Sequence, residues 1–270
     1  MPELPEVERV RQSLVPAMVG ASFDRVVLNR GDLRRPFPAG FAKHLRGQRV
    51  QELTRRGKYL LVVLSSGDTL IIHLGMSGWL RVDNDAALDS RHDHVIFVMS
   101  SGLTVTFNDP RRFGMMDLVS ADRLPRHTSL APMGPEPLSR AFNAKTLAAR
   151  CAGRRMPLKV ALLDQRIVAG LGNIYASEAL HLARLSPVRR ASTVATRGGS
   201  PQPAAVRLTA AIKAVLRRAI RLTGSERYRG GRFRVYDREG EPCPTPACRG
   251  VVARIWQAGR STFYCPVCQR

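Results

Sequence analysis

The sequence predicts an α+β protein, with an N-terminal β-sandwich domain flanked by helices and a C-terminal helical domain ending in a β-hairpin that carries four cysteines. Paired β-rich segments occupy the chain from about residue 22 to 120, and helical periodicities begin beyond residue 140. Four prolines and a glycine lie between residues 125 and 138, a density that interrupts regular structure and is typical of a linker. These observations indicate two different folding patterns on either side of one boundary.

A helix is predicted over residues 5–19. Pro5 suits a first-turn position, and Glu6 and Glu8 favour a helix N-terminus. The apolar residues at helical spacing are Val7, Val10, Leu14 and Met18.

Two hairpins are predicted next. The runs 59–64 and 69–74 are rich in β-branched and aliphatic residues, as are 94–99 and 103–107. A short turn containing serine and glycine separates the members of each pair. Several such pairs predict a β-sandwich or a barrel, and we expect the sandwich.

Helices are predicted for the C-terminal half over 143–151, 157–164, 173–184 and 204–222. The last has one apolar face, with arginines and a lysine left for solvent. The expected domains are therefore a β-sandwich (1–130), a helical domain (131–235) and a terminal cysteine-bearing hairpin (236–270).

The chain is strongly basic. Its 270 residues include 43 Lys+Arg against 21 Asp+Glu, a formal net charge of +22. Such an imbalance predicts an anionic partner, and nucleic acid is the leading candidate. No apolar run approaches the roughly 18–20 residues of a membrane span, and the N-terminus lacks the features of a signal peptide. We therefore expect a cytoplasmic protein with no membrane partner.

Four of the five cysteines lie at the C-terminal end, in the spacing Cys243-x4-Cys248-x16-Cys265-x2-Cys268. Two close pairs on separate turns can direct four thiolates at one tetrahedral ion, and sulfur ligands suit zinc. Disulfides in an exported protein are the alternative, but the absence of a signal sequence favours Zn²⁺. Four protein ligands close the coordination shell, so we expect one structural ion. Cys151 is expected to be a structural thiol.

The amino terminus suggests a nucleophile. A proline after the initiator Met favours Met removal, which would expose a secondary amine at Pro2. An α-amino group has a pKa of about 7.7–8.0, so part of it is unprotonated at neutral pH. Such an amine can attack C1′ of a deoxyribose, and the neighbouring Glu3 can donate a proton to the sugar.

Motifs in consistent order along nearly the whole chain carry a family resemblance: Met1–Glu8, Arg55–Leu60, His73–Gly78, Asn108–Gly114, Asp164–Gln165 with Gly170–Glu178, and Gly259–Cys265. Together they resemble the formamidopyrimidine-DNA glycosylase family. The resemblance implies a base-excision repair enzyme that removes oxidised purines, both formamidopyrimidines and 8-oxoguanine, and nicks the abasic site by β,δ-elimination. It also implies a helix–two-turn–helix element in 131–235, and DNA in a basic cleft between the domains.

Site residues follow from the same resemblance. Pro2 would form the Schiff base, Glu3 would act as the acid, Lys58 would contact a phosphate near the lesion, and Glu6 would orient the amino terminus. Met76, Arg111 and Phe113 would fill the hole left by a flipped base, since apolar wedges and a guanidinium suit that task. The other implied DNA contacts are His92, Arg112, Lys159, Tyr175, Arg260, and Asn173 at a helix start.

One segment departs from the family pattern. Residues 222–236 look shorter than in typical members, where this segment holds a loop over the extruded 8-oxoguanine. We therefore expect weaker excision of 8-oxoguanine relative to formamidopyrimidine. The alternatives are an endonuclease VIII-like enzyme for oxidised pyrimidines and a non-catalytic protein that binds damaged DNA. We expect a bacterial monomer that associates with the nucleoid when bound to DNA.

Overall fold

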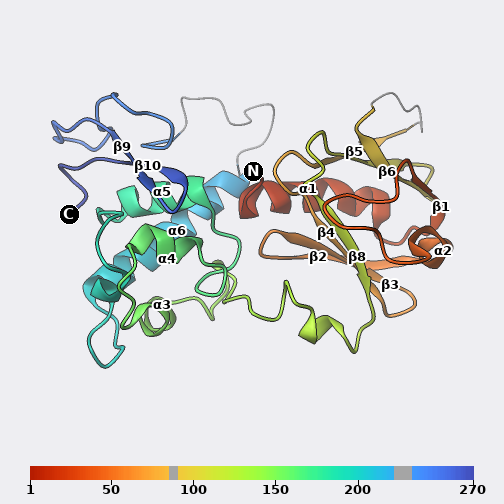
Figure 1. Ribbon diagram of the computed structural model, residues 1–270, viewed down its shortest axis with the longest axis horizontal. Coiled ribbons are helices and arrows are strands. Elements are labelled where there is room, and N and C mark those ends of the chain that lie inside the picture. Colours follow the sequence, from red (N-terminus) through yellow and green to blue (C-terminus); the bar gives the residue numbers. More distant parts are fainter. Residues whose placement is uncertain (85–90, 222–232) are drawn as a thin grey trace. The chain divides into compact units, whose positions relative to one another are not determined.

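The computed structural model describes residues 1–84, 91–221 and 233–270 (Figure 1). The chain forms two compact units, Met1–Ala131 and Pro132–Arg270. The elements of the first unit are α1 (Leu4–Met18), β1 (Phe23–Leu28), α2 (Phe41–Leu45), β2 (Val50–Arg56), β3 (Tyr59–Leu64), β4 (Thr69–His73), β5 (Trp79–Asp83), β6 (Asp93–Met99), β7 (Thr104–Asn108), β8 (Met115–Val119) and the short 3₁₀ helix η1 (Leu124–Arg126).

Helix α1 begins close to the predicted position. A proline lies in its first turn, where the missing N–H removes no helical hydrogen bond. Leu4, Val7, Leu14 and Met18 are fully buried, as the apolar spacing requires. The helix therefore packs one apolar face into the core of the first unit.

Two antiparallel four-stranded sheets make up the rest of this unit. Their strand orders are β1-β6-β7-β5 and β2-β3-β4-β8. Side chains from both sheets join one apolar cluster, including Val62 and Ile72 of one sheet and Phe97 and Phe107 of the other. This arrangement confirms the predicted α+β class with an N-terminal sandwich.

The predicted hairpins are β3–β4 and β6–β7, and both are confirmed. In β3, buried residues alternate with partly exposed ones, which is the period of a strand with one face on the core. Strands β1, β2, β5 and β8 were not predicted individually. They lie at sheet edges or carry charged residues within the run, as in β2 (VQELTRR), so their apolar pattern is weak.

The second unit is helical and ends in a hairpin. Its elements are α3 (Ala144–Cys151), α4 (Leu158–Leu163), α5 (Asn173–Leu182), the 3₁₀ helix η2 (Ala191–Val194), α6 (Pro203–Arg221), β9 (Ala253–Gln257) and β10 (Arg260–Tyr264). The helices predicted over 143–151, 157–164, 173–184 and 204–222 correspond to α3, α4, α5 and α6.

Helix α5 is the central element of the second unit. Its residues from Ile174 to His181 are all buried. It packs against α4, α6 and β10, and Figure 1 shows the hairpin β9–β10 beside it. A helix covered on so many sides can position groups at both of its ends.

Two loops of the first unit approach each other backbone to backbone. Gly75 has a φ of +64°, and a Cβ placed on it would lie 2.3 Å from the carbonyl carbon of Phe113 and 2.5 Å from the nitrogen of Gly114. No side chain fits in that space. Gly75 therefore allows the turn after β4 to contact the segment before β8.

We predict that Gly75→Ala destabilises the protein by roughly 2–5 kcal/mol, because left-handed strain adds to overpacking. Gly67→Ala is the matched control. Gly67 has a φ of +87°, but a Cβ placed on it would meet no atom within 4 Å, so only the strain of roughly 1–2 kcal/mol applies. Urea unfolding of both variants measures the difference, and equal losses would contradict the close contact.

Candidate functional site

The start of α1 carries the predicted nucleophile and acid. Pro2 is half-buried, and Glu3, the N-cap residue, is almost fully buried. The Glu3 backbone N–H donates to Glu6 Oε2 at 2.9 Å, and Arg9 Nη2 donates to Glu6 Oε1 at 3.2 Å. Glu6 therefore fixes the backbone of the residue that follows Pro2.

Lys58 lies in the two-residue loop between β2 and β3. Arg56 pairs with Tyr59 across the hairpin, so the loop consists of Gly57 and Lys58. Gly57 has a φ of 57°, which a glycine adopts without strain. Lys58 is only 7% exposed, so the turn holds the aliphatic stem of this side chain against the protein.

An ion-pair network joins α1 to this hairpin. Glu8 accepts hydrogen bonds from Arg11 at 2.8 and 2.9 Å and from Arg55 Nε at 3.1 Å. The other ends of these arginines bind strand β2 and its turn, with Arg11 Nη1 on the Leu53 carbonyl and Arg55 Nη1 on the Gly57 carbonyl. Burial would raise the pKa of Glu8, but the hydrogen bonds and charges of the two arginines lower it below its usual value. Glu8 therefore ties the helix of Pro2 to the turn of Lys58.

The three predicted wedge residues lie on the two loops that meet at Gly75. Met76 is 43% exposed and Phe113 is 42% exposed, so both present apolar side chains to solvent. Arg111 is also exposed, and its guanidinium carbon lies 4.9 Å from the centroid of the Phe113 ring. This is a cation–π contact. The first unit thus presents two apolar groups and a guanidinium on adjacent loops.

Asp109 holds these loops together. Its carboxylate is fully buried and accepts hydrogen bonds from the Ser77 hydroxyl at 2.6 Å and the Gly114 N–H at 2.7 Å. The Ser77 hydroxyl in turn accepts the Arg111 N–H at 3.2 Å. One buried carboxylate therefore fixes the backbones on which Met76 and Arg111 are mounted.

The remaining predicted contacts of this unit surround the same segment. The Asp109 N–H donates to the His92 carbonyl, and Nε2 of the buried His94 donates to the Asp109 carbonyl at 2.9 Å. His92 itself is half-buried, and the exposed Arg112 has a φ of 57°, an uncommon conformation for arginine. His92 and Arg112 therefore border the loop of Arg111.

The second unit brings two predicted residues into direct contact. Lys159 is fully buried, and its ammonium donates to Asn173 Oδ1, to the Ser261 carbonyl and to Thr262 Oγ1. Asn173 Nδ2 also donates to the Ser261 carbonyl, at 2.9 Å. Lys159 thus connects α4, the first residue of α5 and strand β10. Its side chain lies in the interior, whereas sequence reasoning placed it at the DNA surface.

Tyr175 and Arg260 differ in exposure. Tyr175 is buried in the first turn of α5, and its ring lies edge-on to that of Phe233. Arg260 is exposed at the start of β10, directly after the turn Ala258–Gly259. Both turn residues have positive φ, at 48° and 71°, which is the geometry of a two-residue type I′ hairpin. The turn sets the register that places Arg260 at the strand start.

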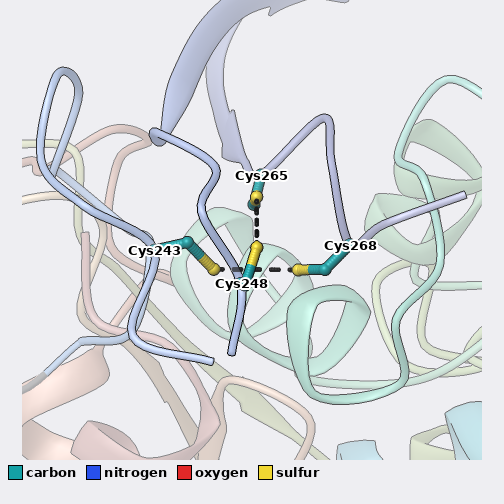
Figure 2. A group of neighbouring side chains, drawn as sticks. All are labelled: Cys243, Cys248, Cys265 and Cys268. Carbon is teal, nitrogen blue, oxygen red and sulfur yellow. Dashed lines mark hydrogen bonds between the residues drawn. The ribbon is translucent and has the colours of Figure 1, made fainter. Parts of the chain in front are cut away.

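The four predicted metal ligands converge on one point. Figure 2 shows the sulfurs of Cys243, Cys248, Cys265 and Cys268 directed toward one another. All four Sγ atoms lie within 4.8 Å of one another. The pairs Cys243–Cys268 and Cys248–Cys265 are each 3.7 Å apart.

These distances fit zinc. A tetrahedral ion with Zn–S bonds of about 2.3 Å separates its sulfurs by about 3.8 Å. Burial would raise the pKa of Cys243, but hydrogen bonds with Thr245 and the neighbouring cysteines lower it, whereas burial and the neighbouring sulfurs raise the pKa of Cys268. A bound cation would favour the thiolate form of all four. The cluster therefore suits one structural Zn²⁺, as predicted. Cys151 lies apart from it in α3, where burial raises the pKa of the thiol to about 11.

Several positioning residues were missed by sequence reasoning. Glu8, Asp109 and Glu178 lie inside the motifs that carry the family resemblance, and their position beside candidate residues is a signal for a positioning role. Glu178 and His181 lie on α5, and no spacing in the sequence indicates what they contact. Glu178 accepts three successive backbone N–H groups, those of residues 234, 235 and 236, at 2.8–3.0 Å.

The fold and the thiolate cluster define a zinc-finger protein of the α+β class. The sequence matches three family profiles in order: the formamidopyrimidine-DNA glycosylase N-terminal domain over residues 1–116, the H2TH domain of these enzymes over 133–228, and the zinc finger found in FPG and IleRS over 240–270. The chain belongs to the formamidopyrimidine-DNA glycosylase family, and the resemblance in sequence is confirmed.

Relatives and solved structures agree with this assignment. The chain is 53% identical to the formamidopyrimidine-DNA glycosylase of Azorhizobium caulinodans and 49% identical to that of Caulobacter vibrioides, covering all of each protein. It is similar to a Lactococcus lactis Fpg mutant in complex with THF-containing DNA (TM-score 0.89, 31% identity, all of both chains). It is also similar to MutM (Fpg) of Thermus thermophilus (TM-score 0.83, 40% identity, 99% of this chain and 98% of that one). Among the described residues, no helix has the length and apolarity needed to cross a membrane.

His73, at the end of β4, gives this region a pH dependence. Its Nδ1 accepts the Gly75 N–H at 3.1 Å, and its ring lies against Tyr59. Burial, together with the positive charges of Lys58 and Arg34, lowers the pKa of His73 to about 4. Between pH 4 and 6.5 the His73 imidazole is therefore protonated in the unfolded chain but remains neutral in the folded chain.

We predict that the stabilising contribution of neutral His73 to the free energy of unfolding is fully present above about pH 6.5 and is lost as the pH falls toward 4. His73→Gln keeps an acceptor for the Gly75 N–H but cannot titrate. The free energy of unfolding of the unmodified protein should fall more steeply over this range than that of the variant, by on the order of 3 kcal/mol. Denaturant unfolding at a series of pH values measures both profiles. Parallel profiles would show that His73 titrates normally.

Proposed function

We propose that this protein is a bifunctional DNA glycosylase and abasic-site lyase that excises oxidised purines during base-excision repair. Membership of the glycosylase family over the full chain, with Pro2 beside the buried Glu3, carries this proposal. Lactococcus lactis Fpg, 31–32% identical to this chain, has been solved with DNA containing an abasic site and, as a mutant, with DNA containing Fapy-dG. Double-stranded DNA with such lesions is the proposed substrate.

The chemistry begins once Met1 has been removed. The lone pair of the Pro2 nitrogen forms a bond to C1′, and the glycosidic bond breaks with its electrons leaving on the base. The Pro2 nitrogen then loses its proton, which the departing base takes up, and Glu3 donates a proton to the sugar oxygen as the ring opens, which leaves an iminium ion. Loss of a C2′ proton expels the 3′ phosphate, a second elimination expels the 5′ phosphate, and water then releases the sugar fragment from Pro2.

The other residues of the first unit bind and reshape the DNA. Lys58 contacts a phosphate next to the lesion. Met76 and Phe113 replace the flipped nucleotide in the base stack, and Arg111 donates to the base left without a partner. Their exposure on adjacent loops supports these roles. His92 and Arg112 contact the backbone nearby.

The second unit binds phosphates. The first N–H groups of α5, starting at Asn173, face an anion favourably, and Arg260 adds a guanidinium from the hairpin. Tyr175 contributes from the first turn of the same helix. Lys159 supports the phosphate-binding residues indirectly, because its ammonium donates hydrogen bonds to Asn173 and to strand β10. The proposed domains are 1–130, 131–235 and 236–270. The protein acts as a monomer in the bacterial cytoplasm and associates with the nucleoid when it is bound to DNA.

We predict that borohydride traps a covalent adduct between the protein and lesion-containing DNA. An N-terminal tag that blocks the amine should abolish the adduct, and Pro2→Gly, which replaces the secondary amine by a primary one, should weaken it. Glu3→Gln should lower the excision rate by about 10²–10⁴-fold, the usual contribution of a general acid. Gel separation of the trapped complex measures the adduct, and DNA affinity of each variant is the control for folding. An undiminished adduct after blocking would exclude Pro2, and no adduct with any lesion would favour the non-catalytic alternative.

The lesion preference depends on residues 222–236, of which 222–232 lie outside the described residues. This segment is short by its own sequence, and the Azorhizobium caulinodans relative aligns with the whole chain over 294 positions, 24 more than the 270 residues here. A shorter segment over the flipped base would weaken the hold on 8-oxoguanine.

We therefore predict a lower ratio of 8-oxoguanine to formamidopyrimidine excision in this protein than in that relative. Single-turnover rates on matched duplexes, with thymine glycol, dihydrouracil and an abasic site included, measure the ranking. Equal ratios in the two proteins would refute the effect of the short segment. A preference for the oxidised pyrimidines would instead support the endonuclease VIII-like alternative.

A further inference from the structure

His181 lies in the last turn of α5 against the thiolate cluster. It is almost fully buried. Its Nε2 lies 3.4 Å from Cys243 Sγ, 3.2 Å from Thr245 Oγ1 and 4.0 Å from Cys268 Sγ. On the other side of the ring, Nδ1 lies 3.2 Å from Arg234 Nε. The imidazole is thus placed between a guanidinium and the sulfur of a candidate zinc ligand.

The arginine decides which ring nitrogen carries the hydrogen. A guanidinium has only N–H donors and keeps its proton in proteins. Nδ1 of His181 must therefore accept the hydrogen bond from Arg234, which requires its lone pair. In a neutral imidazole the hydrogen is then on Nε2, and it points toward Cys243 and Thr245.

We propose that His181 donates a hydrogen bond from Nε2 to the zinc-bound thiolate of Cys243, that Arg234 fixes the required tautomer, and that this pair slows the loss of zinc. Four thiolates outweigh the charge of one Zn²⁺, so the cluster is anionic, and each N–H donor to a sulfur stabilises it. A donor supplied by another helix also orients the ligand that it contacts. The proposal concerns the metal site alone and does not depend on the glycosylase reaction.

Other contacts support a built connection. The Arg234 backbone N–H donates to Glu178 Oε2 at 2.8 Å, and its Nη2 reaches the Pro244 carbonyl at 3.4 Å, next to Cys243. Glu178 and His181 are three residues apart on α5, so they lie on the same side of the helix. Arg234 therefore contacts α5 twice and the loop between the first two cysteines once.

The test compares His181→Phe with His181→Gln in the zinc-loaded full chain. Phenylalanine fills the space without a donor, whereas the glutamine amide can still donate to sulfur. We expect His181→Phe to release zinc to a chromogenic chelator at least about 10-fold faster than the unmodified protein, with a smaller change for His181→Gln. Leu182→Gln is the matched control, since Leu182 is the next residue of α5 and is 44% exposed; it should release zinc at the original rate.

A second measurement needs no substitution. In ¹⁵N-labelled protein carrying ¹¹³Cd in place of zinc, the ring correlations of His181 should show the Nε2–H tautomer, with a scalar coupling from that hydrogen to cadmium. An Nδ1–H tautomer would overturn the proposal. Equal zinc release from His181→Phe and the unmodified protein, with unchanged zinc content and circular dichroism, would overturn it as well. If His181→Phe does not fold, the tautomer and coupling still decide the question.

Discussion

Buried and half-buried carboxylates fix the backbone segments around the candidate functional residues. Asp109 joins the two wedge loops through the Ser77 hydroxyl and the Gly114 N–H. Glu178 accepts hydrogen bonds from three successive backbone N–H groups. Glu8 accepts hydrogen bonds from two arginines that also bind β2 and its turn. A buried carboxylate that loses its donors is costly, so each loop is confined to the conformation that supplies them. In a chain with 21 acidic residues against 43 basic ones, these few acids act as internal anchors while the basic excess remains available to DNA.

The zinc site stabilises the terminal hairpin. Strands β9 and β10 form a two-stranded sheet, which has too little apolar surface to be stable by itself. The local apolar cluster of buried residues consists of Val235, Val252 and Phe263. A tetrahedral ion supplies the missing cross-links, because metal binding contributes directly to the free energy of folding in small domains. The exposed Arg260 can then stand on a rigid strand rather than on a loose terminus.

The parts predicted from the sequence are those with a local signal. Helix α1 has apolar residues at helical spacing, the strands of the two hairpins are runs rich in β-branched and aliphatic residues, and the cysteine spacing indicated the metal site. The place of Lys159 could not be predicted, because its partners on α5 and β10 are about 14 and 102 residues away along the chain. The contact of His181 with Cys243 spans 62 residues in the same way. Such contacts depend on how helices pack, and a sequence pattern describes a helix face without naming its neighbour.

Helix α5 links the two halves of the second unit. Its first residue, Asn173, shares Lys159 and the Ser261 carbonyl with strand β10. Its last turn carries His181, which contacts the cysteine cluster at the base of the same hairpin. The hairpin is therefore fastened to one buried helix at both ends. Helix α5 is stiff along its axis, so the distance between Asn173 and His181 is fixed. A shift of the cysteine loops, one of which continues directly from β10, therefore moves β10 relative to Asn173. The phosphate contacts proposed for the helix start and for Arg260 require a fixed spacing between these two groups, and a structural metal ion at the base of the hairpin would maintain that spacing without any role in bond breaking.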